Sequence, residues 1–244
     1  MKASLIPSRT AFDHLVVMLR DELEQRSPAF EAAGYRLSVP GYHNLGSMNR
    51  LIALDSTYIE LLGWPSGTEP KRKEIAEQAM GLDALVFRSE DAYADQLRLQ
   101  EAGFDVQPVS QLERPVDVQG SSQMARFNTV RFNTQPIPGL RMYFCQHLTP
   151  EHIWNEELLQ HPNGAKFLHS ICISAPDAAA TAKILAQVVD AEALIEEAAC
   201  TIKLANLELT IRPDPQAPAP RIEYAMILHA DGNLHRFEED YRKI

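Results

Sequence analysis

The chain of 244 residues has only three cysteines, Cys145, Cys172 and Cys200, and no two of them are close in sequence. Each cysteine stands among apolar or β-branched residues. An odd number of widely separated thiols argues against a disulfide framework and against a zinc site built from cysteine pairs. The pattern is typical of small buried thiols in a reducing compartment, so we expect a cytoplasmic protein.

Long apolar runs are missing as well. The first ten residues, MKASLIPSRT, contain no apolar stretch long enough for a signal peptide. No run approaches the roughly 20 apolar residues that a membrane-spanning helix needs. Positive charge is also scarce, because 23 Lys and Arg residues face 33 Asp and Glu residues, for a net charge of −10. An acidic chain is repelled by nucleic acids and anionic membranes, so we expect neither partner.

The familiar motifs of nucleotide chemistry and covalent catalysis are absent too. The sequence has no glycine-rich phosphate loop, no nucleophile elbow and no paired CxxC motif. What remains is an ordinary globular composition, with 45% hydrophobic and 23% charged residues. A chain of this length can bury a substantial core, in one large domain or two small ones.

A unit of one strand, one helix and three strands recurs about every 70 to 80 residues. Gly34 and Gly103 are helix stop signals in the first two units. The first unit has an expected strand at 12–19, a helix at 22–33, a strand at 35–39, and a hairpin of strands 50–54 and 57–62. Residues 65–81 form a linker with an expected short helix at 71–80.

The two later units follow the same order. In the second we expect a strand at 82–87, a helix at 90–102 capped by Ser89, strands at 104–109, 124–133 and 140–146, and a polar loop around Pro115 and Gly120. In the third we expect a strand at 167–174, a helix from Pro176 to about residue 189, a hairpin of strands 201–204 and 207–211, and a last strand at 222–228. Residues 234–244 form a short helix or a frayed end.

The repeat predicts an α+β fold in which the first two units pair into a cupped half-barrel and the third, shorter unit packs alongside. The paired units occupy residues 1–148 and the third unit residues 149–244. Pairing covers the concave face of each sheet and leaves a cavity between the units. The third unit has apolar strands but no fourth unit to pair with. Because closed two-fold dimers commonly solve this problem, we expect a homodimer.

Two polar residues interrupt the apolar strands of the first unit and are the main site candidates. His14 lies in FDHLVVML and Glu60 in TYIELLG, and both strands belong to one small sheet. An imidazole and a carboxylate side by side can be half of a divalent-metal site or a proton-transfer pair. The alternative for His14 is a satisfied core histidine. For Glu60 the alternative is a buried ion pair with Arg50 or Arg88.

Four further residues are candidates for binding a substrate: His43, Asn49, Arg88 and Gln146. The loop that carries His43 and Asn44 is expected at the mouth of the cavity. Asn49 begins a strand, where asparagine is disfavoured. Arg88 is expected on the face of Ala84, where its guanidinium could clamp a carboxylate or pair with an acidic residue.

Several segments together resemble the glyoxalase-like family of bacterial proteins, within the vicinal-oxygen-chelate superfamily of glyoxalases, extradiol dioxygenases and bleomycin-resistance proteins. They are FDHLVV, GYHN followed by MNRLIAL, TYIELLG, MYFCQ, and HPNGA ahead of the third unit. The resemblance extends from about residue 12 to about residue 228. No single segment is specific, but their order along the chain supports the resemblance.

The resemblance implies one metal ligand from the first strand and one from the last strand of each unit. The first unit matches with His14 and Glu60, whereas the second departs, with Ala84 in the first strand and Gln146 as a weak amide ligand in the last. A divalent Zn, Ni, Mn or Fe ion at His14, Glu60 and Gln146 would therefore be weakly held. The implied function is an enzyme of lyase, isomerase or dioxygenase type that acts on a small oxygen-rich metabolite. The alternative is a metal-free protein that binds or sequesters a small molecule.

Overall fold

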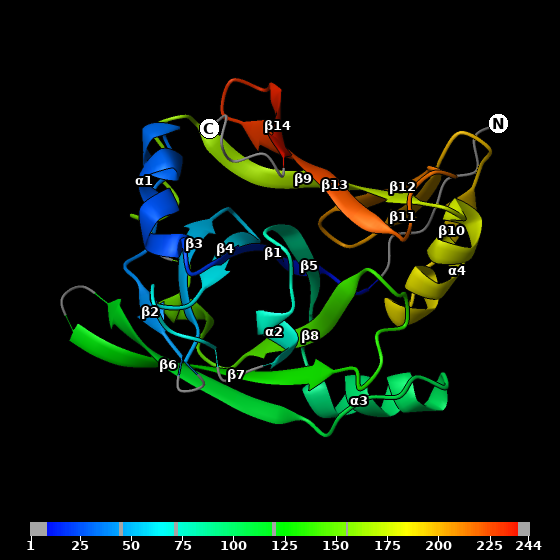
Figure 1. Cartoon of the computed structure of the whole chain (residues 1–244), viewed down its shortest axis with the longest axis horizontal. Coiled ribbons are helices and arrows are strands. Elements are labelled where there is room, and N and C mark those ends of the chain that lie inside the picture. The colour runs from blue at the N-terminus through cyan, green and yellow to red at the C-terminus, as the bar shows by residue number, and fades with distance from the viewer. Residues whose placement is uncertain (1–8, 44–45, 71–72, 119–120, 155, 239–244) are drawn as a thin grey trace.

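The structure is a computed structural model that describes residues 9–43, 46–70, 73–118, 121–154 and 156–238. It is an α+β fold with two mixed sheets, one of eight strands and one of six (Figure 1). No helix in the described part of the chain has the length and apolar character to cross a membrane.

The eight-stranded sheet contains the first two units, in the order β2-β3-β4-β1-β5-β8-β7-β6. Its elements are β1 (Phe12–Arg20), α1 (Leu23–Ala32), β2 (Gly41–Tyr42), β3 (Met48–Ala53), β4 (Tyr58–Gly63), α2 (Lys73–Ala76), β5 (Gly81–Arg88), α3 (Ala92–Glu101), β6 (Ser110–Val118), β7 (Ser121–Arg131) and β8 (Arg141–His147). The order of the second unit mirrors that of the first, and the two meet where β1 and β5 pair antiparallel. In each unit the first strand runs parallel to the last, β1 to β4 and β5 to β8.

This sheet curls until its two edge strands approach each other. A Cβ atom on Gly41 of β2 would lie 2.6 Å from Nη1 of Arg114 in β6. The sheet is therefore a nearly closed barrel (Figure 1). Along β1 the side chains of Val16 and Met18 face the inside of this barrel, and those of Leu15 and Val17 face the outside.

The six-stranded sheet contains the third unit, in the order β10-β11-β12-β9-β13-β14. After the short 3-10 helix η1 (Pro150–His152), its elements are β9 (Ala165–Ala175), α4 (Ala178–Val188), β10 (Ala193–Ile195), β11 (Cys200–Lys203), β12 (Glu208–Pro213), β13 (Arg221–His229) and β14 (Leu234–Glu238). β13 pairs antiparallel with β9, as β5 does with β1. It thus stands where the first strand of a fourth unit would stand.

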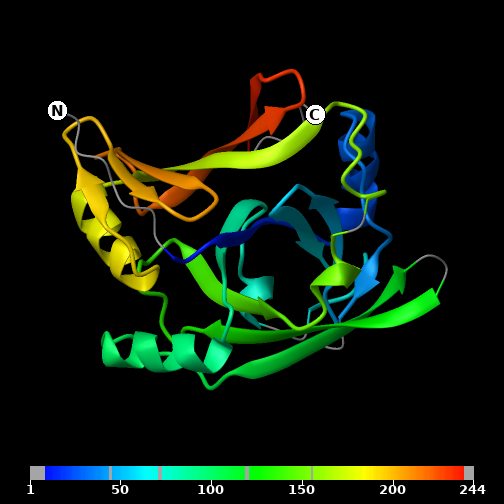
Figure 2. The same ribbon diagram turned by 180° about the vertical axis from the view of Figure 1, so that it is seen from behind.

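The six-stranded sheet lies across the outer face of the barrel (Figure 2). Leu15 and Leu85 of the barrel belong to the same fully buried cluster as Ile171 and Ile227 of the second sheet. The apolar face of the third unit is therefore covered by the first two units. This removes the exposed apolar face on which the homodimer prediction depended.

Most elements follow the sequence prediction, but three segments of the first two units differ. Residues 35–39 and 104–109 are not strands, and residues 110–118, expected as a loop, form β6. Pro115 misled the prediction, because proline is excluded from central strands but tolerated at a sheet edge, which is where β6 lies. The loop Gly120 lies outside the described residues.

Helix boundaries and the last element also differ. The cap of α3 is Asp91 and not Ser89, since the Asp91 carboxylate accepts hydrogen bonds from the backbone N–H groups of Tyr93 and Ala94. In the linker only Lys73–Ala76 is helical among the described residues. Residues 234–238 form β14 rather than a helix, because they pair with β13.

Candidate functional site

The structure brings His14 and Glu60 together inside the barrel. His14 lies in β1 and Glu60 in the parallel neighbour β4, where it pairs with Val16. Both residues are buried, with 3% and 8% of their surfaces exposed. His14 Nε2 lies 3.7 Å from Glu60 Oε2, and the imidazole stacks on the ring of Tyr58 at 4.3 Å. A small polar centre is thus embedded in an apolar interior.

A β-bulge adds Asp13 to this centre. In the pairing of β1 with β5, Phe12 opposes Phe87 and His14 opposes Val86, so Asp13 is the extra residue. A bulge breaks the alternation of side chains, and here it places the carboxylate of Asp13 beside the imidazole of His14. His14 Nδ1 donates a hydrogen bond of 2.7 Å to Asp13 Oδ2. Because the proton sits on Nδ1, Nε2 is presented to the cavity as an acceptor.

Asp13 is fully buried and has two further donors. Its Oδ2 accepts a hydrogen bond of 2.9 Å from His147 Nε2, and its Oδ1 accepts one of 3.0 Å from Arg88 Nε. Burial works to raise the pKa of Asp13, but the charges and hydrogen bonds of His147 and His14 outweigh it and hold the pKa well below its usual range. Asp13 is therefore an ionised anchor for three cationic or donating side chains.

Glu60 is likewise held as a carboxylate. Asn49 Nδ2 donates a hydrogen bond of 2.6 Å to Glu60 Oε1, which leaves Oε2 facing His14. Burial works to raise the pKa of Glu60. The nearby imidazoles of His14 and His43, the Asn49 hydrogen bond and the Arg114 guanidinium outweigh it and lower the pKa below 4.5. Glu60 is therefore an ionised carboxylate whose Oε2 is available to accept a proton from a substrate.

Tyr143 of β8 completes the centre from the second unit. Its hydroxyl donates a hydrogen bond of 3.1 Å to His14 Nε2. Burial, followed by the nearby charge of Glu60, raises the pKa of Tyr143, so the hydroxyl keeps its proton. Val16 in β1 and Val86 in β5 hold equivalent places in the two units. Val86 pairs with Tyr143 as Val16 pairs with Glu60, so the tyrosine takes the place of the glutamate.

Two cavities meet at Tyr143. A small one of about 50 Å³ is lined by His14, Glu60 and Tyr143, together with Arg114 of β6. A larger cleft of about 510 Å³ is also lined by Tyr143 and has a polar lining that includes Arg131. Arg131 stacks over the ring of Tyr143 at 4.9 Å. The ring of Tyr143 therefore borders both cavities.

Comparison with known proteins identifies the family of this chain. A family model described as a glyoxalase-like domain matches residues 12–189. The chain belongs to this family, within the vicinal-oxygen-chelate superfamily. A search of curated proteins finds no match.

Solved structures share the fold at low sequence identity. A hypothetical protein from Staphylococcus aureus matches with a TM-score of 0.68 and 18% identity, over 94% of this chain and 99% of its own. A fusion protein of a xylose isomerase-like TIM barrel and 4-hydroxyphenylpyruvate dioxygenase matches with a TM-score of 0.57 and 12% identity, over 92% of this chain and 38% of its own. A mutant of 4-hydroxymandelate synthase from Streptomyces coelicolor matches with a TM-score of 0.50 and 11% identity, over 89% and 70%. These similarities support the glyoxalase-like fold alone.

The glyoxalase-like site does not include every residue that the sequence suggested. Gln146 lies on the outer face of the sheet, where its Oε1 accepts a hydrogen bond of 3.2 Å from Ala92 N and its Nε2 donates one of 2.8 Å to Glu90 O. The alternation of side chains along β8 correctly predicted that Gln146 and Phe144 share one face of the sheet. That face packs against α3 and does not line the cavity. Gln146 cannot join His14 and Glu60 as a ligand in this arrangement.

The other substrate-binding candidates lie in or beside the cavity. His43 lines it, with Nδ1 2.9 Å from Ser47 Oγ, whereas Asn44 is outside the described residues. Arg88 is engaged with Asp13 and donates a hydrogen bond of 2.6 Å to Ser56 O. Its guanidinium also stacks over Trp154 at 5.0 Å. Arg88 therefore forms an ion pair with an acidic residue, which was one of the two roles predicted for it. The partner is Asp13 and not Glu60.

Sequence reasoning missed four residues of the centre: Asp13, Arg114, Tyr143 and His147. Asp13 stands next to His14 in the sequence, but alternation sends neighbours to opposite faces unless a bulge intervenes. Arg114 was hidden in a segment interpreted as a loop. Tyr143 and His147 had one usable signal, because alternation along β8 puts them on the face opposite Gln146.

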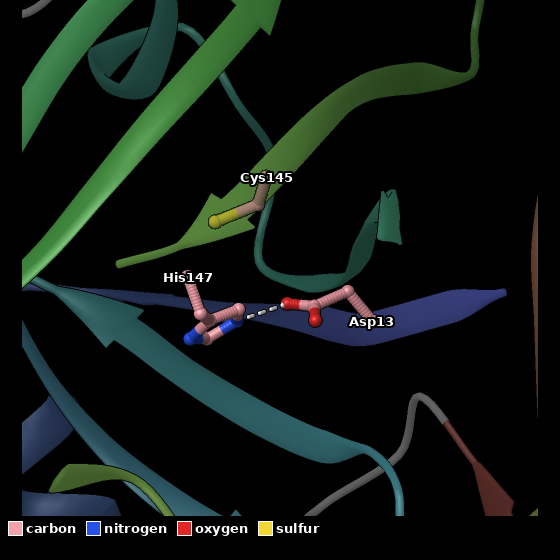
Figure 3. A group of neighbouring side chains, drawn as sticks. All are labelled: Asp13, Cys145 and His147. Atoms are coloured by element: carbon pink, nitrogen blue, oxygen red, sulfur yellow. Dashed lines mark hydrogen bonds and ion pairs between the residues drawn. The ribbon is translucent and has the colours of Figure 1, made fainter. Parts of the chain in front are cut away.

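A metal ion has two candidate positions in the described part of the chain. Ligand atoms of Asp13, Cys145 and His147 all lie within 4.8 Å of one another, so this buried group could hold an ion (Figure 3). Two features oppose it. The Asp13 carboxylate already pairs with Arg88, and burial raises the pKa of the Cys145 thiol, whereas metals bind the thiolate.

The position expected for the superfamily fits a metal poorly. Among the described residues, no group of three His, Cys, Asp or Glu ligands includes His14 or Glu60. The polar group next to His14 and Glu60 is the protonated hydroxyl of Tyr143. The cationic Arg114 lines the same cavity. Two donors beside a guanidinium are a weak set for a dication.

Proposed function

We propose that this glyoxalase-like protein is an enzyme that moves a proton between two adjacent oxygen-bearing carbons of a small metabolite. The observation that carries the proposal is the ionised, buried Glu60. Asn49 holds one of its oxygens, and the other faces His14 Nε2 at 3.7 Å. A base fixed in this way beside a donor and an acceptor suits the isomerisation of an α-hydroxycarbonyl compound.

The reaction needs no oxidant or reductant. Glu60 Oε2 takes the proton from the hydroxyl-bearing carbon, the C–H electron pair becomes a C=C bond, and the carbonyl π pair moves onto oxygen. The Tyr143 hydroxyl can turn from His14 to donate a hydrogen bond to this developing oxyanion. His14 Nε2 carries the hydroxyl proton to the oxyanion while Asp13 holds its Nδ1 proton. Glu60 then returns its proton to the former carbonyl carbon, and the carbonyl and hydroxyl have exchanged places.

The alternative is a protein that binds or sequesters a small molecule without turnover. The cleft of about 510 Å³ beside Tyr143 favours it, because that volume suits a small-molecule ligand. A buried ionised glutamate argues for the enzyme, since burying a charge only to line a passive pocket is costly.

Deuterium uptake from D₂O separates the two functions. A panel of small α-hydroxycarbonyl compounds, beginning with glycolaldehyde and dihydroxyacetone, is incubated with the protein and followed by proton NMR. We expect exchange that slows by about 10²- to 10⁴-fold in Glu60→Gln. Glu113→Gln is the matched control, because Glu113 lies on β6 with 49% of its side chain exposed. A compound that binds but never exchanges would favour the binding protein.

Metal content, oligomeric state and location remain proposals that direct measurements test. Elemental analysis of protein purified without a chelator should find little metal, and stoichiometric metal lost in both His14→Ala and Glu60→Gln would contradict the poor fit described above. The homodimer stays a prediction, for which light scattering must return twice the chain mass of 27.4 kDa. A cytoplasmic location is supported by three free, buried cysteines.

A further inference from the structure

Arg114 is a buried cation in the cavity that contains the opposite charge of Glu60. Only 5% of its surface is exposed. Within the described ranges, no hydrogen bond and no ion pair joins its guanidinium to another residue. A guanidinium carries five N–H donors, and leaving them unsatisfied away from water is costly. The Arg114 nitrogens are not among the sealed side-chain atoms without a hydrogen-bond partner, so they are open to the cavity, where a ligand can complete their bonding.

The guanidinium points into the cavity that contains Glu60. Arg114 lines this cavity, and its Nη1 lies near Gly41, where a Cβ atom would come within 2.6 Å of it. The same Cβ would lie 2.7 Å from Asn49 Oδ1, a buried oxygen that also has no hydrogen-bond partner. The Arg114 guanidinium and an acceptor without a partner therefore lie beside the same point next to Gly41.

The charge of this space selects an anion. Burial lowers the pKa of Arg114, while Tyr58 and Glu60 work against that change, and an arginine stays protonated in proteins. A carboxylate matches the fork of a guanidinium with two parallel hydrogen bonds. A phosphate dianion would suffer stronger repulsion from the ionised Glu60.

We propose that Arg114 binds the carboxylate of a small substrate in which the next two carbons each carry an oxygen. This inference rests on the proposed proton-transfer function and names its substrate class. With the carboxylate on Arg114, the adjacent carbon faces Glu60 and its oxygen faces Tyr143 and His14. The Asn49 Oδ1 atom accepts a hydrogen bond from a hydroxyl of the same molecule.

Glycolate and its neutral analogue glycolamide are the probes. Binding is titrated by protein NMR shifts on the wild type, Arg114→Met and Arg126→Met. Arg126 is the control, because it lies on the neighbouring strand β7 with 51% of its side chain exposed. We expect saturable glycolate binding that weakens at least about 30-fold in Arg114→Met and changes little in Arg126→Met. Glycolamide should bind at least about 30-fold more weakly than glycolate to the wild type.

Stability separates a binding role from a structural one. If Arg114 holds the fold, Arg114→Met lowers the urea midpoint of unfolding. If it awaits a ligand, the midpoint stays the same or rises, because an apolar side chain replaces a buried charge that makes no hydrogen bond or ion pair within the described ranges. Arg114→Lys, which keeps the charge but loses the fork, should recover only part of the affinity.

Three outcomes would overturn the inference: no saturable glycolate binding, equal binding of glycolamide, or unchanged glycolate binding in Arg114→Met. Each is independent of turnover. Glu60→Gln should bind glycolate as well as or better than the wild type, since it removes a repelling charge. If glycolate binding depends on Arg114 but no compound exchanges deuterium, the proposed function fails and the carboxylate site stands.

Discussion

Replacing Asp13 with asparagine is the sharpest test of how the centre is held. The substitution keeps the shape of the side chain but removes a fully buried charge. It leaves Arg88 facing a neutral amide across 3.0 Å, and the asparagine NH₂ opposes the donors of His14 or His147. Breaking a buried ion pair by removing one partner costs about 3–5 kcal/mol. The lower end applies here, because Arg88 keeps 25% of its side chain in water.

We therefore expect Asp13→Asn to lose about 3 kcal/mol of unfolding free energy at pH 7. For a chain of this size that loss lowers the melting temperature by about 6–12 °C. Urea unfolding followed by tryptophan fluorescence measures it, with Trp154 as a reporter because it packs against Arg88 and His147. Asp105→Asn, at an exposed aspartate, should change stability by no more than about 0.5 kcal/mol.

The same variant tests the orientation of His14. Without the anchor on Nδ1 the imidazole can take either tautomer, so proton transfer should slow even where the protein is fully folded. An ordinary hydrogen bond contributes about 1 kcal/mol. A loss of unfolding free energy smaller than this in Asp13→Asn would refute the view that Asp13 is a buried charge that holds three side chains.

Three further outcomes follow from the structure. The pKa values of Asp13 and Glu60 are lowered from 3.8 and 4.5 in the folded protein. The stabilisation that these two carboxylates provide is therefore complete above those values and is lost as the pH falls through the folded-state pKa. The urea midpoint of unfolding should decrease when the pH is lowered below about 4.5, and it should decrease less steeply in Asp13→Asn. The three buried cysteines, including Cys145 with its raised thiol pKa, should react with a thiol reagent at pH 8 only after denaturation, and rapid modification of native protein would contradict their burial. Gly63→Ala would place a Cβ atom 2.2 Å from the backbone oxygen of Arg20, so thermal unfolding should show a loss of about 1–3 kcal/mol.

The repeated unit and the pair of His14 and Glu60 could be predicted from the sequence because both depend on local patterns. His14 and Glu60 each interrupt an apolar run that is typical of a buried strand, and Gly34 marks the end of the first helix. The third unit was recognisable from the same signals. Its last strand, β13, was predicted at 222–228, but β14 was not. The role of β13 was also missed, since nothing local distinguishes a strand that fills a missing unit's place from one that completes its own.

The rest of the centre depends on register and curvature, which a single sequence does not encode locally. The bulge at Asp13 exists only in the pairing with β5. Arg114 reaches the cavity because the sheet curls until β6 approaches β2. Gln146 was misplaced for the complementary reason, since alternation fixes which residues share a face but not which face lines the cavity.

The near closure of the barrel also bears on how the chain avoids aggregation. Free strand edges are templates for pairing with other chains, and natural proteins shorten or cover them. The six-stranded sheet ends in strands of three and five residues, β10 and β14. The long edge is the nine-residue β6, which the native protein shields by curling it toward β2. Partial opening between β2 and β6 would expose that edge first, so insoluble aggregates formed on mild heating should originate at the β6–β7 hairpin.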